Sequence, residues 1–182
     1  MKKAGNPDVV IFMGSDSDWS VMARAAAVLE EFGVTHEAIV SSAHRTHDRT
    51  VTLVKRFTAR GTRVFIAGAG AAAHLAGALA AVTPRPVIGV PLASSPLAGL
   101  DSLLSTAQMP SGVPVACTAI GEAGARNAAI LAVQILALSD RRLEGRLVGY
   151  RKALEREVVA KDARLQRERR QRAGASRGKV KP

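Results

Sequence analysis

The chain has 182 residues, of which 47% are hydrophobic and 3% aromatic, and its formal net charge is +11 at pH 7. That length is enough for one domain with a sizeable aliphatic core, while the single cysteine, Cys117, excludes an internal disulfide framework. No apolar run approaches the roughly 20 residues of a membrane span, and no signal-peptide pattern follows the basic N-terminus. We therefore expect a cytoplasmic protein without a membrane partner.

Apolar strands and helical patterns alternate along the chain. The expected strands are 9–13, 35–40, 63–67, 86–90 and 113–118, and the expected helices are 18–32, 46–59, 71–82 and 123–138. Nearly continuous apolar strands between helices are typical of a parallel sheet covered on both faces. Because crossovers are right-handed, the pattern favours an α/β fold, a three-layer αβα sandwich with a flavodoxin-like five-stranded parallel sheet.

Two polar segments follow the first two expected strands. The first holds Ser15 and Asp18, and the second holds Ser42, His44 and Arg45. Ligands of open parallel sheets bind at strand carboxyl ends, where helix N-termini and arginine suit a phosphate. Histidine, with an ordinary pKa of about 6.5, carries protons near neutral pH. The two segments predict an enzyme acting on a small phosphorylated molecule, although each alone could be a strand exit and helix cap.

A third segment, the glycine-containing stretch 68–70, follows the third strand. It lacks the glycine spacing of a dinucleotide site because position 73 is alanine. His74 lies in the first turn of the helix expected after it. The long connection 92–109 contains Asp101 and Gln108, which either cap a short helix at 102–106 or contact a ligand.

The balance of basic and acidic residues changes near residue 140. Residues 1–140 hold 11 Lys and Arg against 10 Asp and Glu, whereas residues 141–182 hold 15 against 5. Apolar residues recur at helical spacing in this C-terminal part at Leu143, Leu147, Tyr150, Leu154 and Val158. We expect a catalytic domain over 1–140, a C-terminal helical extension over 141–160 and a partly frayed basic tail over 161–182.

The basic tail allows two interpretations. It is either a solvated extension or a nonspecific polyanion contact that weakens with salt. The absence of aromatic residues after Tyr150 favours the first, because no side chain could stack on bases. No other nucleic-acid contact is expected.

Together these segments resemble the class I PurE family of de novo purine biosynthesis. The matching segments are 14–19, 42–46, 67–70, 72–75, 86–91, 99–103, 108–115 and 119–121, within about residues 8–140. The resemblance implies conversion of N5-carboxyaminoimidazole ribonucleotide to 4-carboxyaminoimidazole ribonucleotide by a homo-octamer with no metal or organic cofactor. The alternatives are direct carboxylation of aminoimidazole ribonucleotide, as in a sister class, and a noncatalytic nucleotide-binding domain.

The resemblance also implies roles for the first two polar segments. His44 is the general acid and base, because moving a carboxylate from nitrogen to a ring carbon needs a proton given and then taken. Ser15, Ser42 and Arg45 surround the substrate phosphate, and Asp18 binds the ribose hydroxyls.

The third segment lies against the base by the same resemblance, through Gly70, Ala71 and His74. The family usually has a second glycine where this chain has Ala71, whose Cβ could crowd the base. It also usually has proline at the positions of Ala76 and His47, and these two losses change loop stiffness more than chemistry.

The expected helix 123–138 is apolar on nearly every face after Arg126 and Asn127. Such a helix requires cover on all sides. The cover is either a subunit interface or the C-terminal extension of the same subunit.

Overall fold

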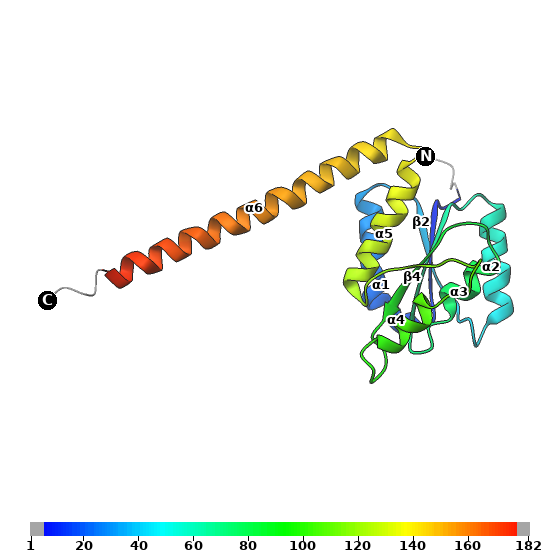
Figure 1. The fold of residues 1–182 in the computed structure, drawn as a ribbon. Coiled ribbons are helices and arrows are strands. Elements are labelled where there is room, and N and C mark those ends of the chain that lie inside the picture. Colours follow the sequence, from blue (N-terminus) through cyan, green and yellow to red (C-terminus); the bar gives the residue numbers. More distant parts are fainter. Residues whose placement is uncertain (1–5, 178–182) are drawn as a thin grey trace. The chain divides into compact units, whose positions relative to one another are not determined.

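The structure, a computed structural model, describes residues 6–177, with side chains as far as Gln171. The chain divides into two compact units between Asp140 and Arg141. In the first unit, five parallel strands form one sheet in the order β2-β1-β3-β4-β5 (Figure 1). The strands are β1 (Val9–Met13), β2 (His36–Val40), β3 (Val64–Gly70), β4 (Val87–Leu92) and β5 (Ala116–Cys117). The predicted flavodoxin-like sheet is confirmed.

Helices cover both faces of this sheet (Figure 1). On one face lie α1 (Trp19–Glu31), preceded by the short 3-10 helix η1 (Asp16–Asp18), and α5 (Glu122–Ala137). On the other lie α2 (His47–Ala59), α3 (Leu75–Ala80) and α4 (Leu100–Ala107). A Cβ on Gly89 of β4 would meet both Ala76 of α3 and Thr106 of α4, so these two helices share a face. The three-layer sandwich is thereby complete.

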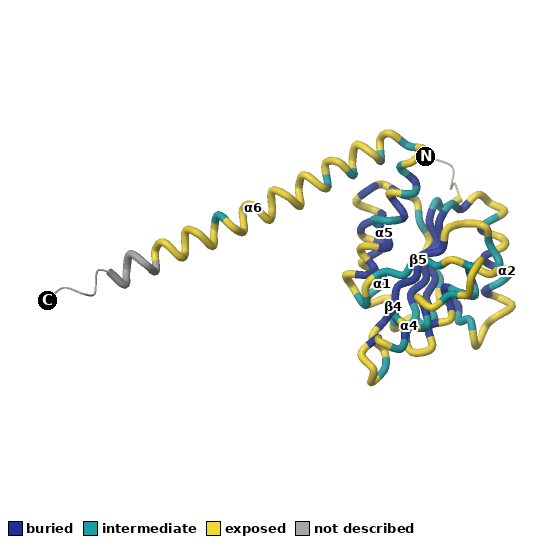
Figure 2. Tube along the Cα trace, in the orientation of Figure 1, coloured by how far each residue is buried: buried dark blue, intermediate teal, exposed yellow. Residues whose placement is uncertain are grey.

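The core is aliphatic with four phenylalanines, and all four are buried: Phe12, Phe32, Phe57 and Phe65. β1 is buried along its whole length because neighbouring strands and helices cover it on every side (Figure 2). The Phe12 and Phe65 rings on adjacent strands lie 6.1 Å apart, centroid to centroid. Burial of each such ring stabilises the folded state by about 1.5–3 kcal/mol. The two rings therefore help to hold the central strands β1 and β3 together.

That edge contains a crevice where the strand order reverses. From β1 the chain enters α1 on one face, whereas from β3 it enters α3 on the other, and β1 and β3 are neighbours with Met13 opposite Gly68. Helices leaving adjacent strands toward opposite faces leave a gap between them, which is where doubly wound sheets bind ligands.

Two predicted boundaries in this region need correction. β3 continues to Gly70 rather than ending at residue 67, and α3 begins at Leu75 rather than at residue 71. The reason is Ala71, whose φ of +49° is left-handed and cannot begin a right-handed helix. A non-helical turn therefore separates the strand from α3 and carries His74 at its end. β5, by contrast, is only two residues long.

The second unit is a single helix, α6 (Arg141–Arg177). It continues past residue 160 into the predicted basic tail, because Arg, Lys, Gln, Glu and Ala are all strong helix formers. The pair of Glu157 and Lys161, one turn apart, joins the two parts with a 2.6 Å ion pair. Within residues 6–177, no helix combines the length and the hydropathy that a membrane span requires. The last five positions of the predicted tail, 178–182, lie outside the described residues.

Candidate active site

A cavity of about 330 Å³ opens at the crevice between the strand carboxyl ends. The loops after β1, β2, β3 and β4 all line it, with Gly14, Ser15, Ser17, Asp18, Ser42, Ala43, His44, Arg45, Ala69, Gly70, Ala72, Leu75 and Ser94. The structure thus brings six of the eight predicted site residues onto one cavity. The other two, Ala71 and His74, are not among its lining residues.

The loop after β1 is organised around Ser15, the N-cap of η1. The Ser15 N–H donates to Asp18 Oδ2 at 3.0 Å, and the Ser15 hydroxyl accepts from the Ser17 N–H at 3.4 Å and from the Ser17 hydroxyl at 2.9 Å. This is a capping box, which satisfies the free N–H groups of a helix start. Ser15 and Asp18 therefore cap the helix and also line the cavity, so the two interpretations of this segment are compatible.

Burial raises the pKa of the Asp18 carboxyl above its ordinary value. Hydrogen bonds from the backbone of Ser15 and Gly14 oppose that shift, as does the positive charge of Arg45, while the charge of Asp16 reinforces it. A partly buried carboxylate facing a cavity is suited to accept hydrogen bonds from a neutral ligand, because a hydroxyl donor would offset its lost hydration.

The Asp18→Asn variant is expected to unfold at the same temperature as the parent or higher at pH 7. Because the folded-state pKa is raised, Asp18 contributes stability when protonated, and that contribution disappears as the pH rises through the folded-state pKa. Asparagine keeps the acceptor for the Ser15 N–H without the buried charge. Thermal unfolding over a pH series should show the gain of the variant shrinking as the pH falls. A loss of stability that is largest at neutral pH would contradict the assignment.

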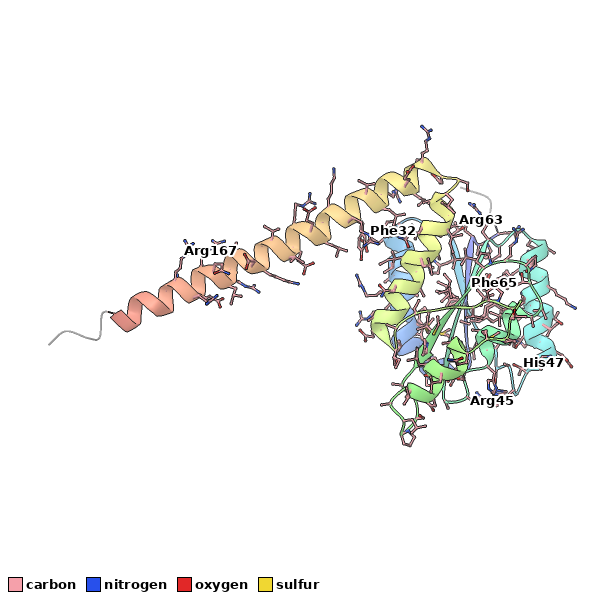
Figure 3. All side chains as sticks on the ribbon, in the orientation of Figure 1. Phe32, Arg45, His47, Arg63, Phe65 and Arg167 are labelled. Carbon is pink, nitrogen blue, oxygen red and sulfur yellow. The ribbon has the colours of Figure 1, made fainter. Side chains whose placement is uncertain are left out.

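The loop after β2 is held by its own side chains. The Ser42 N–H donates to Thr46 Oγ1 at 2.9 Å, and the Arg45 N–H donates to Ser42 Oγ at 3.2 Å. The Arg45 guanidinium reaches across to the first loop and donates through Nη2 to the Gly14 carbonyl at 3.0 Å. Arg45 therefore lies at the carboxyl end of the sheet between the two loops (Figure 3), with further N–H groups available to an anion.

His44 and His74 form a contact that the sequence did not predict. Nε2 of His44 lies 2.8 Å from Nδ1 of His74, and the ring planes are nearly perpendicular, at 89°. One of the two nitrogens must donate and the other accept, so a single proton lies between them. A hydrogen bond to one ring nitrogen selects the tautomer and orientation of a histidine. His74 is therefore placed to orient His44.

The turn of 71–74 holds His74 in that position. The Ala73 N–H donates to the hydroxyl of Ser105 on α4 at 3.0 Å, and the same hydroxyl donates to the Asp101 carbonyl at 2.8 Å. Ala71 is left-handed, a conformation that costs a residue with a Cβ about 1–2 kcal/mol. The contact between His44 and His74 is therefore accompanied by backbone strain at Ala71.

We expect the Ala71→Gly variant to be more stable than the parent by up to about 1 kcal/mol. Glycine removes the energetic cost of a left-handed backbone at this position. It also makes the unfolded chain more flexible, which offsets part of the gain in the free energy of unfolding. In a chain of this size that corresponds to about 2–4 °C in the midpoint of thermal unfolding. Ala72→Gly is the matched control and should destabilise, because Ala72 is not among the residues with positive φ. Destabilisation by both changes would contradict the strain at Ala71.

Ser94 is a cavity residue that the sequence analysis did not single out. It lies two residues beyond β4, so the rule applied to the other strand ends would have found it. It faces β3, because a Cβ added to Gly70 would collide with the Ser94 hydroxyl. The contact explains why position 70 excludes a side chain.

The two polar candidates of the long connection lie elsewhere. Asp101 is in the first turn of α4 rather than at its cap, which is Gly99, and Gln108 ends that helix. A hydrogen bond with the Ser95 side chain lowers the pKa of Asp101. Neither Asp101 nor Gln108 lines the cavity, so the structure gives no support to a ligand contact.

Comparison with known proteins identifies the family. The model for a family described as AIR carboxylase matches residues 8–157. The chain is 55% identical to N5-carboxyaminoimidazole ribonucleotide mutase of Brucella melitensis, covering 84% of this chain and 94% of that protein. It is 53% identical to the Mycobacterium tuberculosis protein of the same name, covering 92% and 95%. This chain belongs to the AIR carboxylase family, which includes PurE.

Solved structures agree with this assignment. A crystal structure of PurE from Treponema denticola resembles the chain with a TM-score of 0.79 at 29% sequence identity, covering 86% of this chain and 97% of that one. Identity to that protein is much lower than to the proteins named as mutases, which include the Escherichia coli protein at 51%. Within the family, the chain is therefore closer in sequence to these mutases.

Proposed function

We propose that the protein is an N5-carboxyaminoimidazole ribonucleotide mutase of purine biosynthesis. The observation that carries the proposal is the cavity itself, where a paired histidine, His44, faces the anion-suited groups of Ser15, Ser42 and Arg45. The names of the relatives at 51–55% identity support the same activity. The chemistry is assigned to residues 1–140.

The substrate's phosphate is proposed to bind Arg45 together with the Ser15 and Ser42 groups. Charge-assisted hydrogen bonds of this kind are worth about 1.5–3 kcal/mol each. Asp18, whose carboxylate is already partly desolvated, accepts the ribose hydroxyls. The flat base lies against Gly70, which lines the cavity and lets the backbone approach a ring closely, with Ala71 next to it in the turn.

His44 supplies the proton transfers in this proposal. As a protonated imidazole it donates to the exocyclic nitrogen while the bond from that nitrogen to the carboxylate carbon breaks and carbon dioxide is released. The ring carbon then forms a bond to the carbon dioxide, and the now neutral His44 removes the proton from that ring carbon. One histidine thus returns to its starting state each turnover. Residue His74 orients the ring throughout, and no metal or organic cofactor takes part.

An assay with both candidate substrates tests the activity. We expect turnover of the carbamate N5-carboxyaminoimidazole ribonucleotide to exceed turnover of aminoimidazole ribonucleotide at low bicarbonate, with no loss in the presence of a metal chelator. The matching family is described as AIR carboxylase, which favours direct carboxylation as the second candidate. Faster turnover of aminoimidazole ribonucleotide would establish that candidate instead, and binding of both without turnover would indicate a regulatory domain.

We also propose a cytoplasmic homo-octamer. Two apolar surfaces support an assembly. α5 buries one face, including Ala128, Ala132 and Leu136, yet its other sides are also largely apolar. At the start of α4, leucines at positions 97, 100 and 104 are 62%, 55% and 50% exposed. Leu100 and Leu104 are four residues apart in α4 and therefore share one face of it, whereas Leu97 lies in the turn before the helix. Exposed apolar faces of this kind mark interaction sites.

Light scattering at micromolar concentration should therefore give the mass of an oligomer, about eight times the 19.1 kDa of one chain for the octamer. Each Å² of apolar surface removed from water contributes about 25 cal/mol of favourable free energy to association. Dilution and salt should change this mass little, because burial of leucine and alanine is insensitive to ionic screening. A stable monomer at micromolar concentration would contradict the proposal.

A further inference from the structure

We infer that the C-terminal part of α6 is a binding surface for double-stranded nucleic acid, independent of base sequence. Residues 161–171 contain five basic side chains and two acidic ones. They lie beyond the part of the chain that the family model matches, which ends at residue 157. The structure adds a fact that composition alone could not supply, namely that this segment is continuous helix.

The basic side chains lie on two opposite sides of the helix rather than on one face. Arg164, Arg167, Arg169 and Arg170 are all exposed (Figure 2). Because successive helical residues turn by about 100°, Arg164, Arg167 and Arg170 share one side of the helix, and Arg169 points to the opposite side. Within residues 6–171 no carboxylate lies at ion-pair distance from any of them, although Arg167, labelled in Figure 3, also donates to the Ala163 carbonyl. Their positive charges remain available to a partner.

A helix with cations on two opposite sides fits a groove with phosphates on both sides. The major groove of a duplex is about 12 Å wide and accepts an α-helix, which there lies between two phosphate rows. A membrane surface would instead need a broad apolar face opposite the charges, and among residues 161–171 only Ala163 and Leu165 are apolar. A single strand would need aromatic side chains for stacking, and none follows Tyr150.

The charge density gives the expected strength. At about 1.5 Å per residue, residues 161–171 span about 16 Å. A duplex carries one charge per about 1.7 Å, so this length faces about nine phosphates. Lys161 is paired with Glu157, so four arginines remain to neutralise phosphates, and the counterions that the duplex releases give a slope of about −3.6 in a plot of log K against log salt concentration. Binding is therefore expected to be weak at physiological salt, with Kd about 10⁻⁴–10⁻⁶ M, and much tighter at low salt.

The test uses the full chain with Arg164→Gln, Arg167→Gln, Arg169→Gln and Arg170→Gln combined. Glutamine is a good helix former, so α6 should keep its circular dichroism signal. The matched control changes four exposed cations of the first unit, Lys55→Gln, Arg60→Gln, Arg85→Gln and Arg126→Gln. Fluorescence anisotropy with a labelled duplex of about 24 base pairs and mixed sequence is recorded at several salt concentrations, for the parent and both variants.

We expect the α6 variant to lose at least tenfold in duplex affinity at low salt and to lower the slope magnitude by about 3–4, whereas the control changes neither substantially. Turnover should be the same in all three proteins, so failure of this inference and failure of the proposed activity are distinguishable. An unchanged slope in the α6 variant would overturn the inference. Equal binding of the parent to a single strand, or to polyglutamate of matched charge, would also overturn it.

Discussion

Replacement of His44 by asparagine is expected to lower the mutase rate at least about 100-fold. General acid and base catalysis contributes about 10²–10⁴-fold to typical enzymes, and asparagine can neither give nor take the proton. Substrate affinity should largely survive, because the proposed phosphate and ribose contacts are made by Ser15, Ser42, Arg45 and Asp18. The variant therefore separates chemistry from binding.

The chain offers a direct probe of that separation. Its single tryptophan, Trp19, follows Asp18 and is 42% exposed, so its fluorescence should report ligand binding in the cavity. His36→Asn is the matched control, since His36 starts β2 and its Nε2 lies 3.9 Å from Glu30, away from the cavity. Near-normal turnover of His44→Asn would remove His44 from the chemistry. Loss of binding and rate together would make it a structural residue instead.

Arg45→Ala is expected to weaken substrate binding by about 10- to 100-fold. The guanidinium is a proposed phosphate partner, and a hydrogen bond to a charged group is worth about 1.5–3 kcal/mol. The change in KM should exceed the change in kcat, because an interaction with an unreacting phosphate is made equally in the ground and transition states. Arg45 also donates to the Gly14 carbonyl, so part of the loss will come from a looser contact between the two loops.

Two companion variants separate these contributions. Arg45→Lys keeps the positive charge but loses the planar fork that can hold two oxygens, so it should recover only part of the affinity. Arg85→Ala removes an exposed arginine that lies before β4, at the opposite end of that strand from the cavity, and should behave as the parent. Unchanged affinity of Arg45→Ala for the ribonucleotide would exclude Arg45 from the phosphate site.

His44 and Arg45 are adjacent in sequence yet point to different partners. His44 contacts His74, which follows β3, whereas Arg45 contacts Gly14, which follows β1. The loop after β2 thereby reaches both strands of the crevice. This arrangement lets one short segment place an acid-base group and an anion-binding group in the same cavity.

Much of the architecture was determined by the sequence alone. The apolar runs that became β1 and β3 are long enough and β-branched enough to be buried strands, and alternation with helices dictates a parallel sheet. A parallel sheet brings all its carboxyl ends to one edge, so polar residues at those ends must meet there. That is why Ser15, Ser42 and Arg45 could be expected around one cavity before any contact was known.

What the tertiary structure alone decided depends on contacts between distant segments. Thirty positions separate His44 from His74, and no local pattern encodes their approach. It requires the left-handed Ala71, held in a turn that Ser105 of α4 completes from another part of the chain. Helical propensity predicted a helix from residue 71, but packing of the turn outweighs propensities of a few tenths of a kcal/mol per residue. Along the C-terminal part of α6 most residues are strong helix formers, and there local propensity accounts for the continuous helix.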